Sequence, residues 1–229
     1  DDQQKMDVYL PAMRNAGTPT VVIIHGGGWT AGDKSDFNGF IAELQKRLPG
    51  YAFVNFNYRL ATSEGNYFPT QENDIMEAMK FLKGKTSSYT ISEQFILTGI
   101  SAGAHLALLQ GYKHNDIIQP AGIVSFYGPV DLERLYVNSD ATIPWVLRNI
   151  THTTLEKDPG IFSSSSPINY VNSGSAPTLL LHGDADSLVP LEQATMLQKK
   201  LDALSVFNKL VVYKGRGHGW EGADLEDSF

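Results

Sequence analysis

The pentapeptide GISAG at residues 99–103 is the stretch of this sequence that decides the fold. A short apolar run at residues 95–97 precedes it, and a run of strong helix formers at residues 102–109 follows it. We therefore expect a sharp turn from a strand into a helix at Ser101, with a glycine two positions away on either side to let neighbouring backbone approach. Such a turn holds a serine hydroxyl above the edge of a sheet, although a helix-capping serine is the alternative interpretation.

Short apolar runs alternate with helix-period segments on both sides of this turn. Further strands are expected at residues 21–24, 52–56, 123–126, 178–181 and 210–213, and further helices at residues 37–48, 69–84 and 191–204. This alternation is typical of an α/β fold, with a mostly parallel central sheet and helices on both faces.

We expect a single domain over residues 1–229, because a chain of this length with 42% hydrophobic residues can bury one full core. The alternating pattern lapses at about residues 131–176, where prolines and the serine tract at 163–166 interrupt weak helical stretches. Long irregular connections in compact proteins are often lids or binding segments. We interpret this region as a short lid-like insertion and not as a second domain.

Composition excludes several classes of partner and chemistry. The formal net charge is −7 without a long basic run, so neither nucleic acid nor an anionic membrane surface is expected to bind. The absence of cysteine removes disulfides, thiolate metal sites and a cysteine nucleophile. The longest uncharged stretch, residues 159–181, is too rich in Ser, Asn, Gly and Pro for a membrane span. The chain starts at Asp1 without an apolar signal region, so we expect a processed or truncated N-terminus. A secreted or periplasmic location is therefore one of the locations that stay open. The oligomeric state stays open as well.

A glycine-rich loop, HGGGW at residues 25–29, follows the first predicted buried strand. Three consecutive glycines carry a high conformational cost, which close approach of backbone N–H groups to a ligand would explain. The amides of Gly27 and Gly28, together with that of Ala102, are candidates for an oxyanion hole, in which the loss of one donor typically costs about 2.7 to 4 kcal/mol. A phosphate cradle fits less well, because neither of the usual glycine-rich phosphate motifs matches.

A serine nucleophile needs a base, and a neutral imidazole is the usual one at pH 7. Of the six histidines, His218 is the one that follows the last predicted strand, in a glycine-rich segment that can reach a serine distant in sequence. We expect His105 to be packed in the interior, because it lies four residues after Ser101 on the same helix. Asp184 and Asp186 lie between a strand and a helix, and both are candidates for the acid that orients the base.

These motifs together resemble the α/β-hydrolase superfamily, and within it the serine esterases with an HGGGW oxyanion motif: bacterial carboxylesterases, the hormone-sensitive-lipase-like group, and feruloyl or acetyl-xylan esterases. The likeness covers nearly the whole chain, and residues 25–34 look like the HGGGW-x-x-GDK version of the motif. It implies an α/β-hydrolase fold with Ser101 as nucleophile, Asp186 as acid and His218 as base, and leaves Asp184 to organise its turn. No separate helical cap precedes residues 8–11, so the resemblance does not extend to lipase-like recognition of long acyl chains.

The resemblance implies a serine carboxylesterase that hydrolyses short-chain acyl esters of small molecules through a Ser-His-Asp triad and an acyl-enzyme, without a metal or other cofactor. Acetyl and feruloyl groups on carbohydrates are candidate substrates by resemblance alone. Trp29 and Tyr127 are candidates for the substrate pocket, with a partial lid around Trp145, and core packing is the alternative for both aromatics. A small serine peptidase, an arylformamidase and a non-catalytic binding protein on the same fold are the alternative functions.

Overall fold

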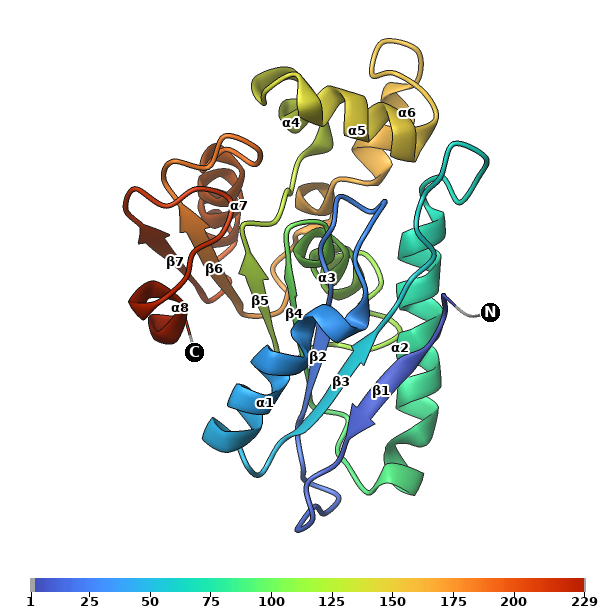
Figure 1. Ribbon diagram of the computed structural model, residues 1–229, viewed down its shortest axis with the longest axis vertical. Helices are drawn as coiled ribbons and strands as arrows, with labels where there is room; N and C mark the ends of the chain where they lie inside the picture. Colours follow the sequence, from blue (N-terminus) through green and yellow to red (C-terminus); the bar gives the residue numbers. More distant parts are fainter. Residues whose placement is uncertain (1–2, 229) are drawn as a thin grey trace.

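A seven-stranded sheet runs through the part of the chain, residues 3–228, that the computed structural model describes (Figure 1). The strand order is β1-β3-β2-β4-β5-β6-β7, in which β1 is antiparallel to β3 and all other neighbours are parallel. The strands are β1 (Met6–Tyr9), β2 (Thr20–Ile24), β3 (Ala52–Phe56), β4 (Phe95–Ile100), β5 (Gly122–Phe126), β6 (Thr178–Gly183) and β7 (Asn208–Tyr213). The mostly parallel sheet predicted from the sequence is confirmed, and β1 is an additional edge strand that the sequence pattern did not indicate.

Helices cover both faces of the sheet, as predicted. They are α1 (Asn38–Arg47), α2 (Thr70–Tyr89), α3 (Ala102–Tyr112), α7 (Glu192–Ala203) and α8 (Ala223–Asp227), with a 3-10 helix η1 (Lys34–Phe37) before α1. Helix α1 packs on one face, where Ile41 contributes to a cluster with Val21 and Phe53 of the sheet. Helices α2, α3 and α7 contribute to the larger cluster on the other face. Every residue of α3 is buried, so this helix lies at the centre of the protein.

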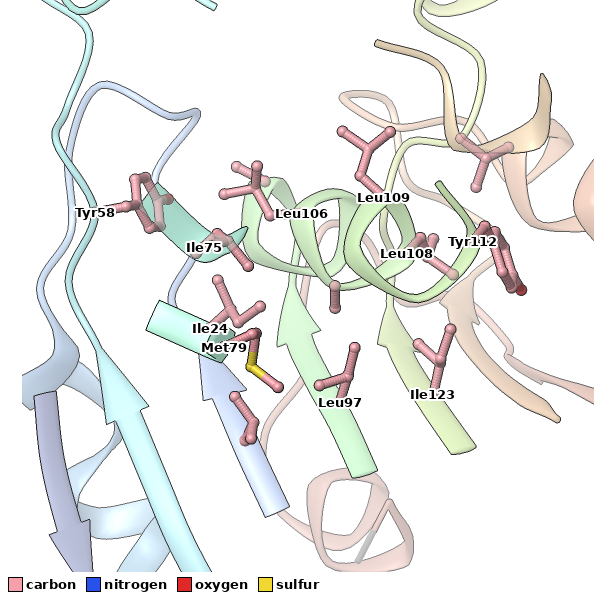
Figure 2. Packing of buried hydrophobic residues seen from close by; sticks show 14 of the residues in the cluster. Ile24, Tyr58, Ile75, Met79, Leu97, Leu106, Leu108, Leu109, Tyr112 and Ile123 are labelled. Atoms are coloured by element: carbon pink, nitrogen blue, oxygen red, sulfur yellow. The ribbon is translucent and has the colours of Figure 1, made fainter. Parts of the chain in front are cut away.

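The larger cluster holds the strand-to-helix turn in place from below. Figure 2 shows Leu106 of α3 above Ile24 and Leu97 of the sheet, with Met79 of α2 beside Ile24. These four side chains are at most 1% exposed. Burial of one such side chain stabilises the folded state by about 1.5 to 3 kcal/mol, so this layer of side chains holds α3 against the sheet.

Helix α2 ends at Tyr89, five residues beyond the end predicted near Gly84. A Cβ at Gly84 would meet no atom within 4 Å, and glycine inside a helix costs only about 1 kcal/mol relative to alanine. Thr86, beyond the glycine, is buried, and packing therefore carries the helix through this position. The helix stops at Thr90, whose φ of 56° places it in the left-handed region.

Three short helices occupy the region where the sequence pattern lapses: α4 (Leu132–Asn138), α5 (Thr142–Thr151) and α6 (Pro159–Ser164), followed by the 3-10 helix η2 (Pro167–Tyr170). They lie over the carboxyl edge of the sheet (Figure 1). Asp131 and Asp158 cap α4 and α6 with their side chains. Leu135, Leu147 and Phe162 join the main core cluster, so these helices pack on the rest of the protein. That the segment is an insertion into one domain, and that it acts as a lid, stays a prediction.

None of the helices found between residues 3 and 228 has both the length and the apolar character needed to cross a lipid bilayer.

Candidate active site

The carboxyl ends of four adjacent parallel strands meet at one edge of the sheet. The register pairs Ile24 of β2 with Gly99 of β4, Ile100 of β4 with Phe126 of β5, and Phe126 with Leu181 of β6. The loops that follow these strands carry all the side chains that the sequence singled out for chemistry, apart from His218, which follows β7. In open α/β sheets ligands bind at this edge.

Ser101 sits on a strained turn between β4 and α3. Its backbone has φ 50° and ψ −120°, a conformation that L-residues rarely adopt and that costs about 1 to 3 kcal/mol. A Cβ at Gly99 would lie 2.4 Å from the carbonyl carbon of Gly103, and a Cβ at Gly103 would lie 2.1 Å from the carbonyl oxygen of Ile24. The turn therefore requires glycine at both positions, as the sequence analysis expected.

The structure brings Ser101, His218 and Asp186 together. Ser101 Oγ is 2.8 Å from His218 Nε2, and His218 Nδ1 is 2.7 Å from Asp186 Oδ2. The Ser101 hydroxyl bonds His218 and does not cap α3, so the helix-cap interpretation is wrong. With Asp186 ionised, Nδ1–H donates to the carboxylate, which leaves Nε2 as the acceptor for the serine proton. This arrangement can move a proton from the hydroxyl to the imidazole.

Asp186 is buried and accepts hydrogen bonds from His218 and from two backbone amides. Its Oδ1 accepts hydrogen bonds from the amides of Leu188 at 3.0 Å and Val189 at 2.9 Å. A second imidazole lies beside Oδ2: His182 Nε2 is 3.5 Å away and donates to the carbonyl of Val189 at 2.7 Å. Burial alone raises the pKa of Asp186, but the hydrogen bonds from His182 and His218 outweigh it and hold the pKa well below its usual range. His182 was not singled out from the sequence, although its position at the end of β6, four residues before Asp186, was the available signal.

Asp184 and its neighbours fix the loop that carries His218. Asp184 Oδ1 accepts a hydrogen bond of 2.5 Å from the amide of Gly215, and the amide of Ala185 donates to the carbonyl of Arg216 at 2.9 Å. A Cβ at Gly183 would lie 2.2 Å from that same carbonyl oxygen. Asp184 was expected to organise its own turn through local hydrogen bonds, but its carboxylate instead bonds the loop after β7. His218 arrives beside Asp186 because these two loops are bonded to each other.

Aromatic rings support His218 from the side. The Tyr127 ring is edge-on to the His218 ring, with centroids 4.7 Å apart, and Trp220 packs edge-on against Tyr127 at 5.2 Å. Trp220 also stacks on Tyr213 at 4.3 Å. Burial and the nearby Asp186 charge raise the pKa of Tyr127 to about 12, so its phenol is neutral at physiological pH. Trp220 was not singled out in the sequence.

The glycine-rich loop after β2 faces the serine turn. Gly27 and Gly28 have φ values of 102° and 58°, and a Cβ at Gly27 would lie 2.2 Å from the carbonyl oxygen of Ala31. Within residues 3–228 no protein acceptor bonds the backbone amides of Gly27, Gly28 or Ala102. These three N–H groups are therefore free to donate to a ligand.

Trp29 anchors this loop to the core. Its indole is only 3% exposed and Nε1 donates to His105 Nδ1 at 3.2 Å, while His105 Nε2 bonds the carbonyl of Ser165 at 2.7 Å. Burial lowers the pKa of His105 to about 4, so the ring is neutral and its two partners define the tautomer with a proton on Nε2. The expected interior position of His105 is confirmed. The indole of Trp29 packs in the core, which was the alternative to a place in the substrate pocket. The residue also borders the cavity described next.

An apolar cavity of about 330 Å³ opens beside Ser101 and His218. The reacting groups, the glycine loop and Tyr127 form one side of it. The remaining wall consists of apolar or small side chains from the end of β4, from the loops and from α4 and α5: Ile100, Pro129, Leu135, Thr142, Ile143, Val146, Leu188 and Val189. A partial lid was expected around Trp145: its neighbours Thr142, Ile143 and Val146 line the cavity, whereas Trp145 itself does not and is 58% exposed.

A serine on a strained strand-to-helix turn, bonded to a histidine that an aspartate orients at the carboxyl edge of a parallel sheet, places this protein in the α/β-hydrolase class. The chain belongs to the BD-FAE family, which it matches over residues 6–201.

Proteins similar to this chain include two from Mycobacterium tuberculosis. Esterase LipC is 27% identical over 98% of this chain and 59% of its own length, and the probable carboxylic ester hydrolase LipM is 33% identical over 80% of this chain and 45% of its own length. The chain thus spans about half the length of the curated relatives it matches. Among solved structures, a truncated carbohydrate esterase from gut microbiota superposes with a TM-score of 0.82 at 25% identity, covering 97% of this chain and 87% of the other.

Proposed function

We propose that this protein is a serine carboxylesterase that hydrolyses small-molecule esters with short acyl chains. The observation that carries the proposal is the 2.8 Å contact between Ser101 Oγ and His218 Nε2 at the mouth of an apolar cavity. Similarity to proteins named as esterases supports it.

In the first half of the proposed reaction, Ser101 attacks the ester carbonyl. His218 Nε2 takes the hydroxyl proton as the Oγ–carbon bond forms, and a tetrahedral intermediate with one anionic oxygen results. The bond from carbon to the alcohol oxygen then breaks, and His218 returns the proton to the leaving alcohol. The acyl group remains on Ser101 as an ester.

Water completes the cycle by the same route. His218 removes a proton from the water as it attacks the acyl carbon, and then protonates Ser101 Oγ as the carboxylic acid leaves. Asp186 stays ionised throughout, because its donors hold its pKa low, and it stabilises the imidazolium that forms at each step.

The free amides of Gly27, Gly28 and Ala102 are the proposed oxyanion donors. They are backbone groups on loops fixed by close glycine contacts, so they need little reorganisation when charge develops on the carbonyl oxygen. The loss of one such donor typically costs about 2.7 to 4 kcal/mol of transition-state stabilisation.

We assign the acyl group to the apolar cavity. Its volume of about 330 Å³ is at the lower end of the range, about 300 to 1,000 Å³, of small-molecule pockets. Short chains such as acetate and butyrate are therefore the proposed acyl groups, and an aromatic feruloyl group is the largest candidate.

The test is turnover of p-nitrophenyl acetate and butyrate by the wild type and by Ser101→Ala. We expect hydrolysis of both esters by the wild type and a loss of at least about 10³-fold in the variant. If neither the wild type nor the variant hydrolyses either ester, the proposed catalytic activity is overturned. Cleavage of an aminoacyl-anilide without the esters would indicate a peptidase, and a clear preference for N-formylkynurenine would indicate an arylformamidase.

A further inference from the structure

One buried imidazole connects the two segments that carry the candidate oxyanion amides. Ala102 begins α3, and His105 lies three residues later on the same helix, so main-chain hydrogen bonds fix the spacing between them. Trp29 directly follows Gly28 in the glycine-rich loop, and its indole Nε1 donates to His105 Nδ1 at 3.2 Å. A side-chain hydrogen bond therefore joins the loop of Gly28 to the helix of Ala102.

Gly28 is held less closely by its own surroundings than Gly27. A Cβ at Gly27 would lie 2.2 Å from the carbonyl oxygen of Ala31, so this residue is pressed against main chain. A Cβ at Gly28 would meet its nearest atom only at 3.7 Å, in the side chain of Val146. The position of the Gly28 amide therefore depends on the residue that follows it.

That residue, Trp29, is fixed at its main chain and at its side chain. Its φ of 60° is uncommon for a bulky residue, and such a conformation persists only where the surrounding structure holds it. The carbonyl of Trp29 accepts a hydrogen bond from the amide of Ala61 at 2.9 Å, and the indole is bonded to His105. Loss of the bond to His105 would leave the backbone beside Gly28 with one of these two supports.

The second nitrogen of His105 is bonded to the segment that follows α6. Nε2 lies 2.7 Å from the carbonyl oxygen of Ser165, to which it donates. The next residue, Ser166, accepts a hydrogen bond of 2.8 Å from the amide of Leu132 at the start of α4, so this carbonyl belongs to a bonded part of the structure. With the proton on Nε2, the imidazole presents Nδ1 as an acceptor, which is the form that can receive the N–H of Trp29.

Packing alone does not explain a histidine at this position. The ring meets the indole of Trp29 edge-on at 5.2 Å and the ring of Phe68 at 5.6 Å, which are contacts that a phenyl ring can also make. His105 is 0% exposed, and burial of two ring nitrogens is unfavourable unless each has a hydrogen-bond partner. Both partners are present, and together they fix the plane and the direction of the imidazole.

We propose that His105 is a positioning residue for the oxyanion hole. It accepts the indole N–H of Trp29 while it donates to the carbonyl of Ser165, and it thereby holds the Gly28 amide in register with the Ala102 amide. In the described part of the chain, His105 is not among the residues that line the cavity beside Ser101, so it acts through Trp29 and does not touch the substrate. This inference rests on the proposed esterase function and adds a residue to its machinery.

The experiment measures kcat and KM for p-nitrophenyl acetate in Trp29→Phe, His105→Phe and His105→Gln. Loss of a whole oxyanion donor costs about 10² to 10³ in kcat, so displacement of the Gly28 amide should lower kcat about 10- to 100-fold in both phenylalanine variants, with KM within about threefold of the wild type. Because the two residues act through one hydrogen bond, the double variant should lose little more than either single variant. Glutamine offers one acceptor and one donor, so His105→Gln should recover kcat to within about fivefold of the wild type.

His114→Phe is the matched control for a loss of stability. His114 follows α3 at its other end, and its Nε2 lies 2.5 Å from a carboxylate oxygen of buried Glu72. Its removal takes a partner from Glu72 and should lower Tm, with kcat unchanged. If His114→Phe and the phenylalanine variants lose kcat in proportion to their loss of Tm, His105 has a structural role only and the proposal is overturned.

A second measurement needs no ester turnover. A small alkyl fluorophosphonate modifies an activated serine: Ser101 Oγ bonds to phosphorus, fluoride leaves, His218 takes the proton, and the phosphoryl oxygen occupies the oxyanion site. Mass spectrometry gives the rate of this modification, which we expect to fall at least about tenfold in Trp29→Phe and His105→Phe.

The outcomes separate the two proposals. If the wild type hydrolyses the ester and the phenylalanine variants keep kcat and the rate of modification within about threefold, the positioning role is overturned and the esterase stands. If no ester is hydrolysed but the wild type is modified and Trp29→Phe is modified at least about tenfold more slowly, the esterase fails and the positioning role stands. A wild type that is neither active on the ester nor modified would overturn both.

Discussion

Replacing Asp186 by asparagine should abolish most activity without changing the shape of the site. Asp186 Oδ1 accepts two backbone hydrogen bonds, from Leu188 and Val189, so the carboxamide oxygen will keep that position. The amide NH₂ must then face His218 Nδ1, which now has to accept a hydrogen bond. The imidazole proton moves to Nε2 and points at Ser101 Oγ, where the ring is no longer able to take the serine proton.

A histidine held in the wrong tautomer lowers kcat by about 10⁴ in triads of this kind. At 1.36 kcal/mol for each factor of ten, this is about 5.4 kcal/mol of transition-state stabilisation. Asp184→Asn is the matched control: Asp184 lies in the same loop but is exposed, and an asparagine oxygen still accepts from the amide of Gly215. We expect its kcat/KM to stay within about threefold of the wild type.

The assay is kcat/KM for p-nitrophenyl acetate, with thermal unfolding of each variant to verify folding. Activity of Asp186→Asn within tenfold of the wild type would refute the tautomer argument. A loss of about 10⁴ in Asp184→Asn instead would show that the acid had been assigned to the wrong aspartate.

Three further predictions concern stability. Gly103→Ala brings a Cβ to 2.1 Å from a backbone oxygen of β2, so it should lower the free energy of unfolding by about 3 kcal/mol and Tm by about 6 to 12 °C. Gly84→Ala has open space around its Cβ and should raise the free energy of unfolding by up to about 1 kcal/mol. Equal Tm values for the two variants in a thermal melt would contradict this prediction. Burial lowers the pKa of His105 to about 4, so below pH 6.5 the unfolded chain binds more protons than the folded one. The free energy of unfolding should therefore fall by roughly 3 kcal/mol as pH drops from 6.5 toward 4. In urea unfolding, His105→Gln should flatten this dependence on pH, and an unchanged dependence would refute the prediction. Hydrogen bonds, led by those from Ser35, lower the pKa of Asp33 to about 2, so its charge stabilises the fold above about pH 4 and this stabilisation is lost toward pH 2. Asp33→Asn keeps the helix cap but has no charge to lose. Calorimetry at pH 4.5 and 2.5 should therefore show a smaller loss of stability in the variant than in the wild type, and an equal loss would be the contrary result.

The residues proposed for chemistry were readable from the sequence because local constraints mark them. Buried parallel strands are continuous apolar runs, and the groups at their ends lie at one edge by topology. Glycine marks the positions where backbone meets backbone, as at Gly99 and Gly103, whose Cβ atoms would clash with main-chain atoms. Identity and spacing alone therefore indicate where the turn lies.

Features that depend on long-range packing were not readable in this way. Strand β1 has four half-buried residues without a clear period, and α8 has five residues, none of them buried. His182 looks like any residue at the end of a strand until the loop after it folds back and brings Asp186 to 3.5 Å. Trp220 supports His218 through Tyr127, which follows β5, and stacks in turn on Tyr213 at the end of β7.

For the same reason, the sequence predicts the residues proposed for the reaction better than it predicts those proposed for specificity. The reacting groups follow strand ends, which main-chain hydrogen bonds between neighbouring strands fix relative to one another. Helix α5 is not part of the sheet: it is held mainly by buried side chains such as Leu147 and Ile150, together with a main-chain hydrogen bond from the Phe68 amide to the Ile150 carbonyl. Since residues 143 and 146 of this helix line the cavity beside Ser101, exchange of residues at these positions can change the shape of the cavity while the proposed proton relay keeps its geometry. Substrate preference should therefore change through α5 more readily than the reaction itself.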